Sequence, residues 1–339
     1  MRRFLTYVHT SSTRECFAYV ILSFALTWSV WIAVLLASRR HEQLGDLLII
    51  GAFGPSVAAT LLSYRSVRVP GSKLFSRFVC FSLALLVCWV VLLCHASLWD
   101  ELRLSHGARL LLLLPSAIPA WVVSTPFSRD GGIRATMRTL LVLRPVVWHA
   151  VALFLFPVLL LSTATVTRIQ GGALHQPKIV GSGLSFSLLV IVEFGYAFFL
   201  GGGVSEETGW RGFLLPRLQK HFNPLLASLL VWFPWALWHL PLDFTGYAGP
   251  TSVDYLRTRV LVLVPLSIIM TWLYNRCGRT ILSAALFHSS FNVAPDFVPS
   301  ARWAEGVIVL MAVVVIVIDK MWRKTVSKIV VSSERTALP

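Results

Sequence analysis

Hydrophobic residues in this chain gather into ten nearly unbroken runs separated by short polar stretches. Most runs approach the roughly 17–25 residues that a helix needs to cross a bilayer, and the ninth is short for a span. Because the runs are continuous rather than alternating in polarity, helices are expected rather than barrel strands. The pattern predicts an all-α, polytopic membrane helix bundle of about 8–10 transmembrane helices. The runs occupy residues 17–38, 47–64, 78–98, 110–127, 146–165, 184–203, 224–242, 259–275, 281–294 and 304–318.

The composition favours a membrane protein over a soluble one. Of the 339 residues, 56% are hydrophobic and 13% are charged, whereas soluble domains carry about 25% charged residues. The net charge of +15 would suit a nucleic-acid partner, but the Lys and Arg residues lie in short loops between the apolar runs, as in polytopic membrane proteins. We therefore expect the lipid bilayer to surround the chain, and no nucleic-acid partner.

Positively charged residues alternate between the two sides of the predicted bundle. The N-terminal end and every second loop hold 21 of the 30 Lys and Arg residues, and the intervening loops hold the other 9. Because cytoplasmic loops carry the excess of Lys and Arg, this alternation predicts ten spans with both termini in the cytoplasm. It also places Arg217 and Lys220 on the cytoplasmic side. The run 17–38 lacks a small-residue cleavage site, so we expect no cleavable signal peptide.

Two adjacent carboxylates, Glu206 and Glu207, follow the sixth apolar run. Hydrocarbon cannot solvate a carboxylate, so an acidic residue at membrane depth is a candidate functional group. Glu207 and Arg211 are one helical turn apart and can form an ion pair. Glu206 points about 100° away around the helix, which leaves it free to act. The alternative is a structural ion pair near the interface, although one pair needs only one glutamate.

Two later segments carry polar side chains that can join these carboxylates. His239 ends the aromatic segment Phe233–His239, where a lone histidine is more often a packed core residue. His288 and Asn292 are four residues apart and project from one helix face, although this spacing also occurs by chance. At about 1.5 Å per residue from the cytoplasmic loops, Glu207, His239 and His288 lie roughly 20, 24 and 14 Å deep. Their common location in the middle of the bilayer core predicts one shared, water-reachable cavity.

Hydrolysis is the chemistry that such a cavity suits. A carboxylate can take a proton from water while a histidine orients that water. A second histidine and an amide can donate hydrogen bonds to a developing oxyanion. Alternatively, Glu206, His239 and His288 bind a divalent metal such as zinc, which acidifies the water. The cofactor is thus either zinc or none, and the HExxH and GxSxG motifs of common zinc proteases and serine hydrolases are absent.

Three motifs follow one another in a specific order. They are Glu206-Glu207-x-x-x-Arg211, an aromatic residue four positions before His239, and His288-x-x-x-Asn292. In that order they resemble the CPBP family, which includes the glutamate-type CAAX prenyl endopeptidases and bacteriocin-processing or abortive-infection-like membrane proteins. The likeness covers about residues 190–294, including the flanking stretch Gly212–Leu218. One departure is Trp235, which stands where the family pattern has Phe.

The resemblance implies an all-helical intramembrane protease of the glutamate or metallo type, with its motifs around a cavity open to the cytoplasm. By position in the motifs, Glu206 is implied to be the general base and His239 its partner on the water. Glu207 is implied to support the site through its pairing with Arg211.

The third motif is implied to supply the oxyanion site, through His288 and Asn292. On this resemblance, residues 1–180 hold N-terminal transmembrane segments without a recognisable motif. Residues 181–300 form the CPBP-like catalytic core, and residues 301–339 form the last transmembrane helix and a basic cytoplasmic tail.

The expected function is that of an intramembrane endopeptidase. It would hydrolyse a peptide bond in a membrane-associated protein or peptide, in CAAX-type processing or a related reaction, with a water activated by Glu and His. One alternative is a catalytically inactive relative that acts in bacteriocin immunity or as a membrane scaffold. The other is a proton-coupled transporter, which would spread polar residues along a path across the bilayer. Glu193 is the only other intramembrane carboxylate that the sequence predicts.

Overall fold

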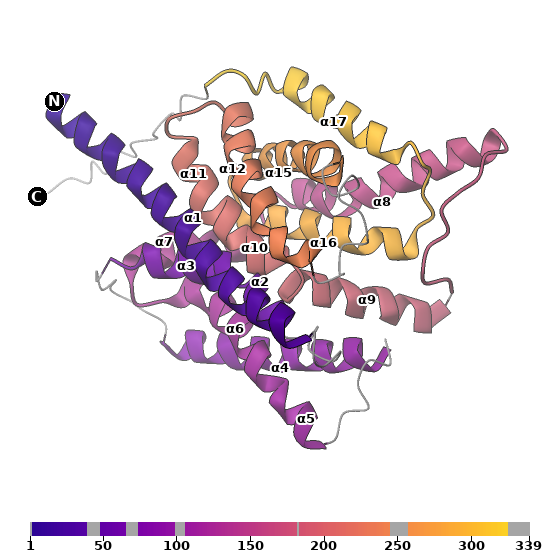
Figure 1. Ribbon diagram of the computed structural model, residues 1–339, viewed down its shortest axis with the longest axis horizontal. Coiled ribbons are helices and arrows are strands. Elements are labelled where there is room, and N and C mark those ends of the chain that lie inside the picture. Colours follow the sequence, from indigo (N-terminus) through magenta and orange to yellow (C-terminus); the bar gives the residue numbers. More distant parts are fainter. Residues whose placement is uncertain are drawn as a thin grey trace, which may run out of the picture.

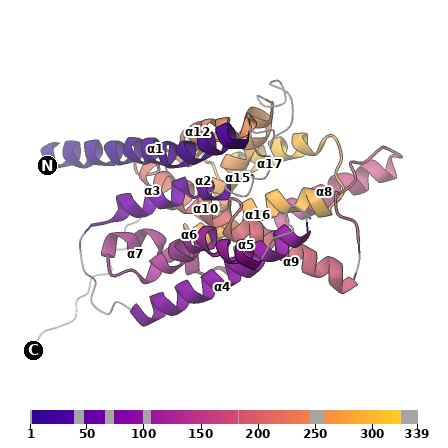
Figure 2. The ribbon, with the colours of Figure 1, turned by 60° about the horizontal axis from the view of Figure 1, so that its bottom comes forward.

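The computed structural model describes residues 2–38, 48–65, 74–98, 106–181, 183–244 and 257–324. The structure is 82% helical, and no strand occurs within these ranges. Figures 1 and 2 show the helices packed as one bundle, with the short helix α10 (Gly203–Gly209) near its middle. The predicted all-α class is confirmed.

The bundle is built from long helices joined by short helical turns. The first part of the chain supplies α1 (Arg2–Ser38), α2 (Leu48–Ala52), α3 (Gly54–Ser63), α4 (Leu74–Leu98), α5 (His106–Leu111), α6 (Leu113–Ser124), η2 (Thr125–Phe127), α7 (Gly131–Met137), η3 (Arg138–Leu141) and α8 (Val146–Ile169). The second part supplies α9 (Gly183–Phe199), α10, η4 (Trp210–Leu214), α11 (Leu215–Leu218), α12 (Pro224–Trp238), α13 (Leu240–Asp243), η5 (Thr258–Val262), α15 (Leu263–Arg276), α16 (Ile281–Phe297) and α17 (Ala304–Ile318).

Within the described ranges, seven helical stretches are long and apolar enough to cross a membrane, which makes the protein an integral, multi-pass membrane protein. They are residues 13–37, 74–96, 109–127, 146–169, 183–218, 224–242 and 258–276. The shorter apolar helices 48–63 and 304–318, together with α16, occupy the other three predicted runs. The tail 325–339 and several charged loops lie outside the described residues, so the orientation of the termini stays a prediction.

The sixth predicted run, 184–203, differs from the structure at its end. The chain stays helical from Gly183 to Leu218, interrupted by a turn between α9 and α10. Gly202 in this turn has φ of 119°, a conformation that side chains with a Cβ rarely adopt. The turn redirects the chain so that α10 starts a new helical segment in the protein interior.

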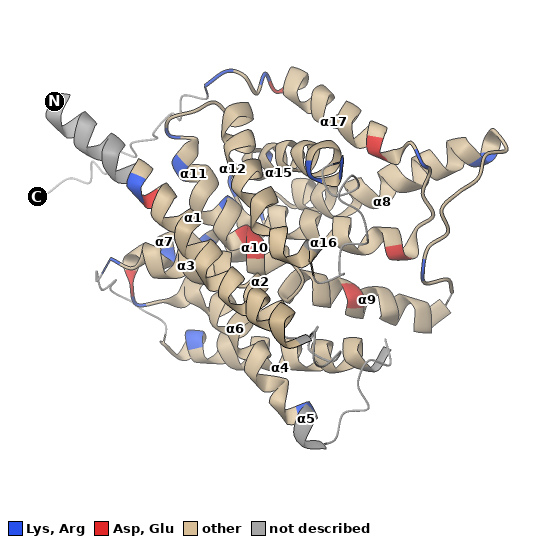
Figure 3. Cartoon of the chain, viewed as in Figure 1, with Lys and Arg blue, Asp and Glu red and all other residues tan. Residues whose placement is uncertain are grey.

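Close packing places α10 at the centre of the bundle. All seven of its residues are buried. A Cβ added at Gly209 would lie 2.3 Å from the Tyr19 hydroxyl of α1 and 2.6 Å from the Pro55 carbonyl oxygen of α3, so only glycine permits this approach. Figure 3 shows acidic residues at α10, among helices whose residues are mostly uncharged.

The two halves of the chain share one hydrophobic core rather than forming separate bodies. The Trp238 indole of α12 donates to Thr27 Oγ1 of α1 at 2.7 Å. The Ser290 hydroxyl of α16 donates to the Leu153 carbonyl of α8 at 2.6 Å. The segments before residue 181 therefore hold the helices of the candidate core in place.

Candidate active site

Glu207 is the centre of a buried polar cluster. Its Oε1 accepts a hydrogen bond from Arg211 Nη1 at 2.9 Å, and neither side chain is exposed to any extent. Arg211 Nη2 also lies 3.4 Å from Ser267 Oγ of α15. The predicted pairing of Glu207 with Arg211 is confirmed, and the pair is buried in the protein interior.

Arg211 stands in a short π-helical turn, η4, that directly follows α10. Such turns widen the helix by one residue and often occur at functional sites. All five residues of η4 are buried. The pattern of apolar positions does not predict this turn, because it is that of an ordinary helix.

His288 reaches the same carboxylate from α16. Its Nδ1 lies 2.8 Å from Glu207 Oε1, and its side chain is only 6% exposed. Because a carboxylate paired with a guanidinium accepts hydrogen bonds, Nδ1 carries the proton in this contact. Sequence reasoning assigned only Arg211 to Glu207, and no spacing rule links positions 81 residues apart.

Glu206 has a different partner from its neighbour. Its Oε2 accepts a hydrogen bond from the indole Nε1 of Trp235 on α12, at 2.6 Å. Its other oxygen has no hydrogen-bond partner among the described residues. The expectation that Glu206 is left free is thus wrong for one of its two oxygens. The motif comparison marks Trp235 only as a departure from the family's Phe, and no sequence pattern predicts its indole donor to Glu206.

His239 lies at the C-terminal end of α12 and is half-buried. Its Nδ1 is 2.8 Å from the Trp235 carbonyl oxygen. Because a carbonyl only accepts, Nδ1 carries the proton, and Nε2 of the neutral ring presents a lone pair. The ring also packs edge-on against Trp238, with ring centroids 4.8 Å apart.

His288 and Asn292 both reach the turn between α9 and α10, as expected for two residues on one face of α16. A Cβ added at Gly202 would lie 2.6 Å from His288 Nε2, so this ring packs directly on the glycine backbone. Asn292 Nδ2 donates to the Gly201 carbonyl at 2.8 Å, and the Asn292 side chain is exposed. One amide hydrogen of Asn292 remains for another acceptor.

The fold therefore brings the candidate residues together, some by direct contact and two through an intermediate group. Glu206, Trp235, Arg211, Glu207 and His288 form one buried network, in which the Arg211 guanidinium lies 4.7 Å from the Trp235 ring centroid. His239 joins this network through the Trp235 carbonyl, and Asn292 joins it through the turn beside His288.

The alternative of a bound metal stays a prediction. Among the described residues, no three His, Cys, Asp or Glu side chains are grouped closely enough to hold an ion. Glu206, His239 and His288 each have one polar atom hydrogen-bonded to another protein group and a second donor atom without a hydrogen-bond partner in the described part of the chain. We derive no step of the reaction through a metal.

Glu193, the other predicted intramembrane carboxylate, lies on α9 away from this cluster. Its Oε1 is 2.9 Å from His95 Nδ1 of α4, and the His95 ring stacks on Tyr196 at a centroid distance of 3.7 Å. The described hydrogen bonds do not connect this pair to the Glu206 network.

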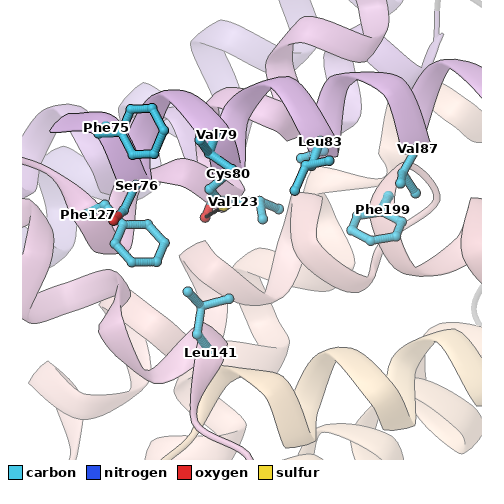
Figure 4. A pocket seen from close by; sticks show the side chains of 11 residues that line it. Phe75, Ser76, Val79, Cys80, Leu83, Val87, Val123, Phe127, Leu141 and Phe199 are labelled. Atoms are coloured by element: carbon cyan, nitrogen blue, oxygen red, sulfur yellow. Dashed lines mark hydrogen bonds between the residues drawn. The ribbon is translucent and has the colours of Figure 1, made fainter. Parts of the chain in front are cut away.

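A separate apolar groove of about 480 Å³ runs along α4 (Figure 4). Its lining includes Phe75, Leu83 and Val87 of α4, Phe127 of η2 and Phe199 at the end of α9. None of the candidate site residues lines it. This groove is thus not the polar cavity that the sequence predicted.

Comparisons with known proteins match the segment that holds the cluster. Residues 186–294 match the family described as Type II CAAX prenyl endopeptidase Rce1-like. The chain is also similar to the "CAAX prenyl protease 2" of Methanococcus maripaludis, with 28% identity over 233 residues, which are 63% of this chain and 83% of the relative. All six candidate site residues lie within the matched segment. These matches support the resemblance to the CPBP family of CAAX prenyl endopeptidase-like membrane proteins that the three motifs indicate.

Proposed function

We propose that the protein is an intramembrane endopeptidase that hydrolyses a peptide bond in a membrane-associated protein or peptide, with CAAX-type processing as its reaction. The observation that carries this proposal is that two adjacent buried carboxylates have different hydrogen-bond partners. Glu207 is held by Arg211 and His288, while one oxygen of Glu206 has no hydrogen-bond partner in the part of the chain that the structure describes. A structural ion pair would explain the first carboxylate but not the second.

The two acceptors that remain suit one water molecule. Glu206 Oε1 takes the proton as general base, and His239 Nε2 accepts a hydrogen bond from the other water hydrogen. The water oxygen then attacks the carbonyl carbon of the substrate. Glu206 passes its proton to the leaving amine as the carbon–nitrogen bond breaks, so it ends the cycle as a carboxylate.

The negative charge on the carbonyl oxygen would be stabilised from α16. His288 donates through Nδ1 to Glu207, so it can donate to an oxyanion only through Nε2, as an imidazolium. Asn292 adds its second amide hydrogen, and such donors act where charge develops in the transition state.

The test is hydrolysis of a quenched fluorescent peptide ending in a prenylated Cys-aliphatic-aliphatic-Xaa sequence, by purified protein in lipid nanodiscs. Glu206→Gln keeps the size of the side chain but removes the base, so we expect a loss of about 10²–10⁴ in rate. Glu305→Gln is the matched control, because Glu305 is 40% exposed and pairs with Arg257 away from the cluster. Wild-type activity in Glu206→Gln would refute the assignment of the base.

Two further measurements decide between the alternatives. Metal analysis of the wild type and of His288→Ala shows whether a stoichiometric zinc is bound and lost, which would replace the general-base mechanism by a metal-dependent one. An unprenylated copy of the peptide reports whether cleavage needs the lipid. Absence of cleavage of every peptide by the folded wild type would favour the inactive relative or the transporter.

A further inference from the structure

Trp235 makes a contact with the candidate base that few residues can make. Its Nε1 donates to Glu206 Oε2 over 2.6 Å, and the two residues are only 2% and 6% exposed. A hydrogen bond to an ionised group in a buried site is stronger than one between neutral groups in water. A phenylalanine, which the motif pattern has at this position, has no such donor.

The remaining contacts of Trp235 fix the direction of that donor. The Arg211 guanidinium lies 4.7 Å from the centroid of its ring. The His288 ring meets it at a centroid distance of 5.8 Å and an interplanar angle of 70°. Its backbone carbonyl accepts from His239. One residue thus contacts groups from all three motifs, and its ring has little freedom to turn.

We propose that Trp235 is a positioning residue that holds Glu206 by Oε2 and thereby aims Oε1 at the water to be activated. This inference rests on the proposed function and adds to it a residue that acts through the base. Without the indole donor, the Glu206 carboxylate can rotate about its last side-chain torsion, which is a soft one. The carboxylate would then spend part of its time in orientations in which Oε1 does not face the water.

The same hydrogen bond favours the ionised form of Glu206. The other charged groups near this carboxylate are His288, Arg211 and Glu207. All three stay in place when only the indole N–H is removed. The acidic limb of the pH–rate profile should therefore move to higher pH by about 1–2 units, the equivalent of one hydrogen bond to a charged group.

The experiment compares Trp235→Phe with the wild type in the peptide assay over a range of pH. We expect the acidic limb of kcat/KM to move up by about 1–2 pH units, kcat at low pH to fall about 10–100-fold, and KM to change little. Trp31→Phe is the matched control, because Trp31 is also buried and its indole donates at 2.7 Å, but to the Leu48 carbonyl. It should leave the acidic limb in place.

A second variant and a second readout separate positioning from folding. Benzothienylalanine at position 235 keeps the bicyclic shape and replaces the N–H with sulfur, and it should move the limb as Trp235→Phe does. Infrared difference spectra against Glu206→Gln follow protonation of Glu206 without any substrate, so they test the contact even if the peptide is not cleaved. The proposal is overturned if Glu206 is protonated at the same pH in the wild type and in the benzothienyl variant.

Discussion

Replacing Arg211 with Met should destabilise the protein more than most single substitutions, because it leaves Glu207 charged in the interior. Both side chains are 0% exposed, and the pair spans 2.9 Å. Removing one partner of a buried ion pair costs about 3–5 kcal/mol. His288 still donates to Glu207 and offsets part of this cost, while the lost contact with the Trp235 ring adds to it. We therefore expect a loss of about 3–5 kcal/mol in the free energy of unfolding.

The double variant Arg211→Met with Glu207→Gln should recover much of that loss. In the native protein, Glu207 Oε2 and Arg211 Nε are buried without a hydrogen-bond partner among the described residues, so the pair is incompletely satisfied. Incompletely satisfied buried pairs gain little over neutral residues of similar size, whereas an unpaired buried charge is costly. The expected order of stability is wild type, double variant, then Arg211→Met.

Unfolding by SDS in mild detergent measures these free energies. A thiol-reactive fluorogenic dye can report the transition, because Cys88 and Cys277 are free and fully buried. Arg257→Met is the control, since Arg257 and Glu305 are 52% and 40% exposed and such pairs contribute less than about 1 kcal/mol. The reasoning is refuted if Arg211→Met matches this control, or if the double variant is no more stable than Arg211→Met.

Two further predictions concern the oxyanion site and the topology. Asn292→Ala should lower kcat by roughly 10²-fold with KM nearly unchanged, because an oxyanion donor acts in the transition state; steady-state kinetics on the prenylated peptide check this, and an unchanged kcat would remove Asn292 from the site. A reporter enzyme fused after Pro339 should be active only in its cytoplasmic format, as the 21-to-9 division of basic residues predicts. A signal from the opposite side would mean that the predicted number of spans is wrong by one.

The sequence alone determined the class of the protein and the contacts that lie within one helix. Continuous apolar runs require helices in a bilayer, because every backbone polar group must be satisfied inside its own segment. The pairing of Glu207 with Arg211 and the common face of His288 and Asn292 follow from the helical period, which holds wherever a helix forms. The order of the motifs indicated the family, which the comparisons support.

Only the tertiary structure decided which polar groups meet across helices. Equal depth in the membrane brings side chains to one level, but the rotation and crossing of the helices determine which atoms face one another. His288 therefore meets Glu207, and the Trp235 indole meets Glu206, although no spacing in the chain predicts either contact. The turn at Gly202 and the π-turn η4 likewise depend on close packing around α10, since one short π-turn does not change the period of the apolar pattern enough to be recognised.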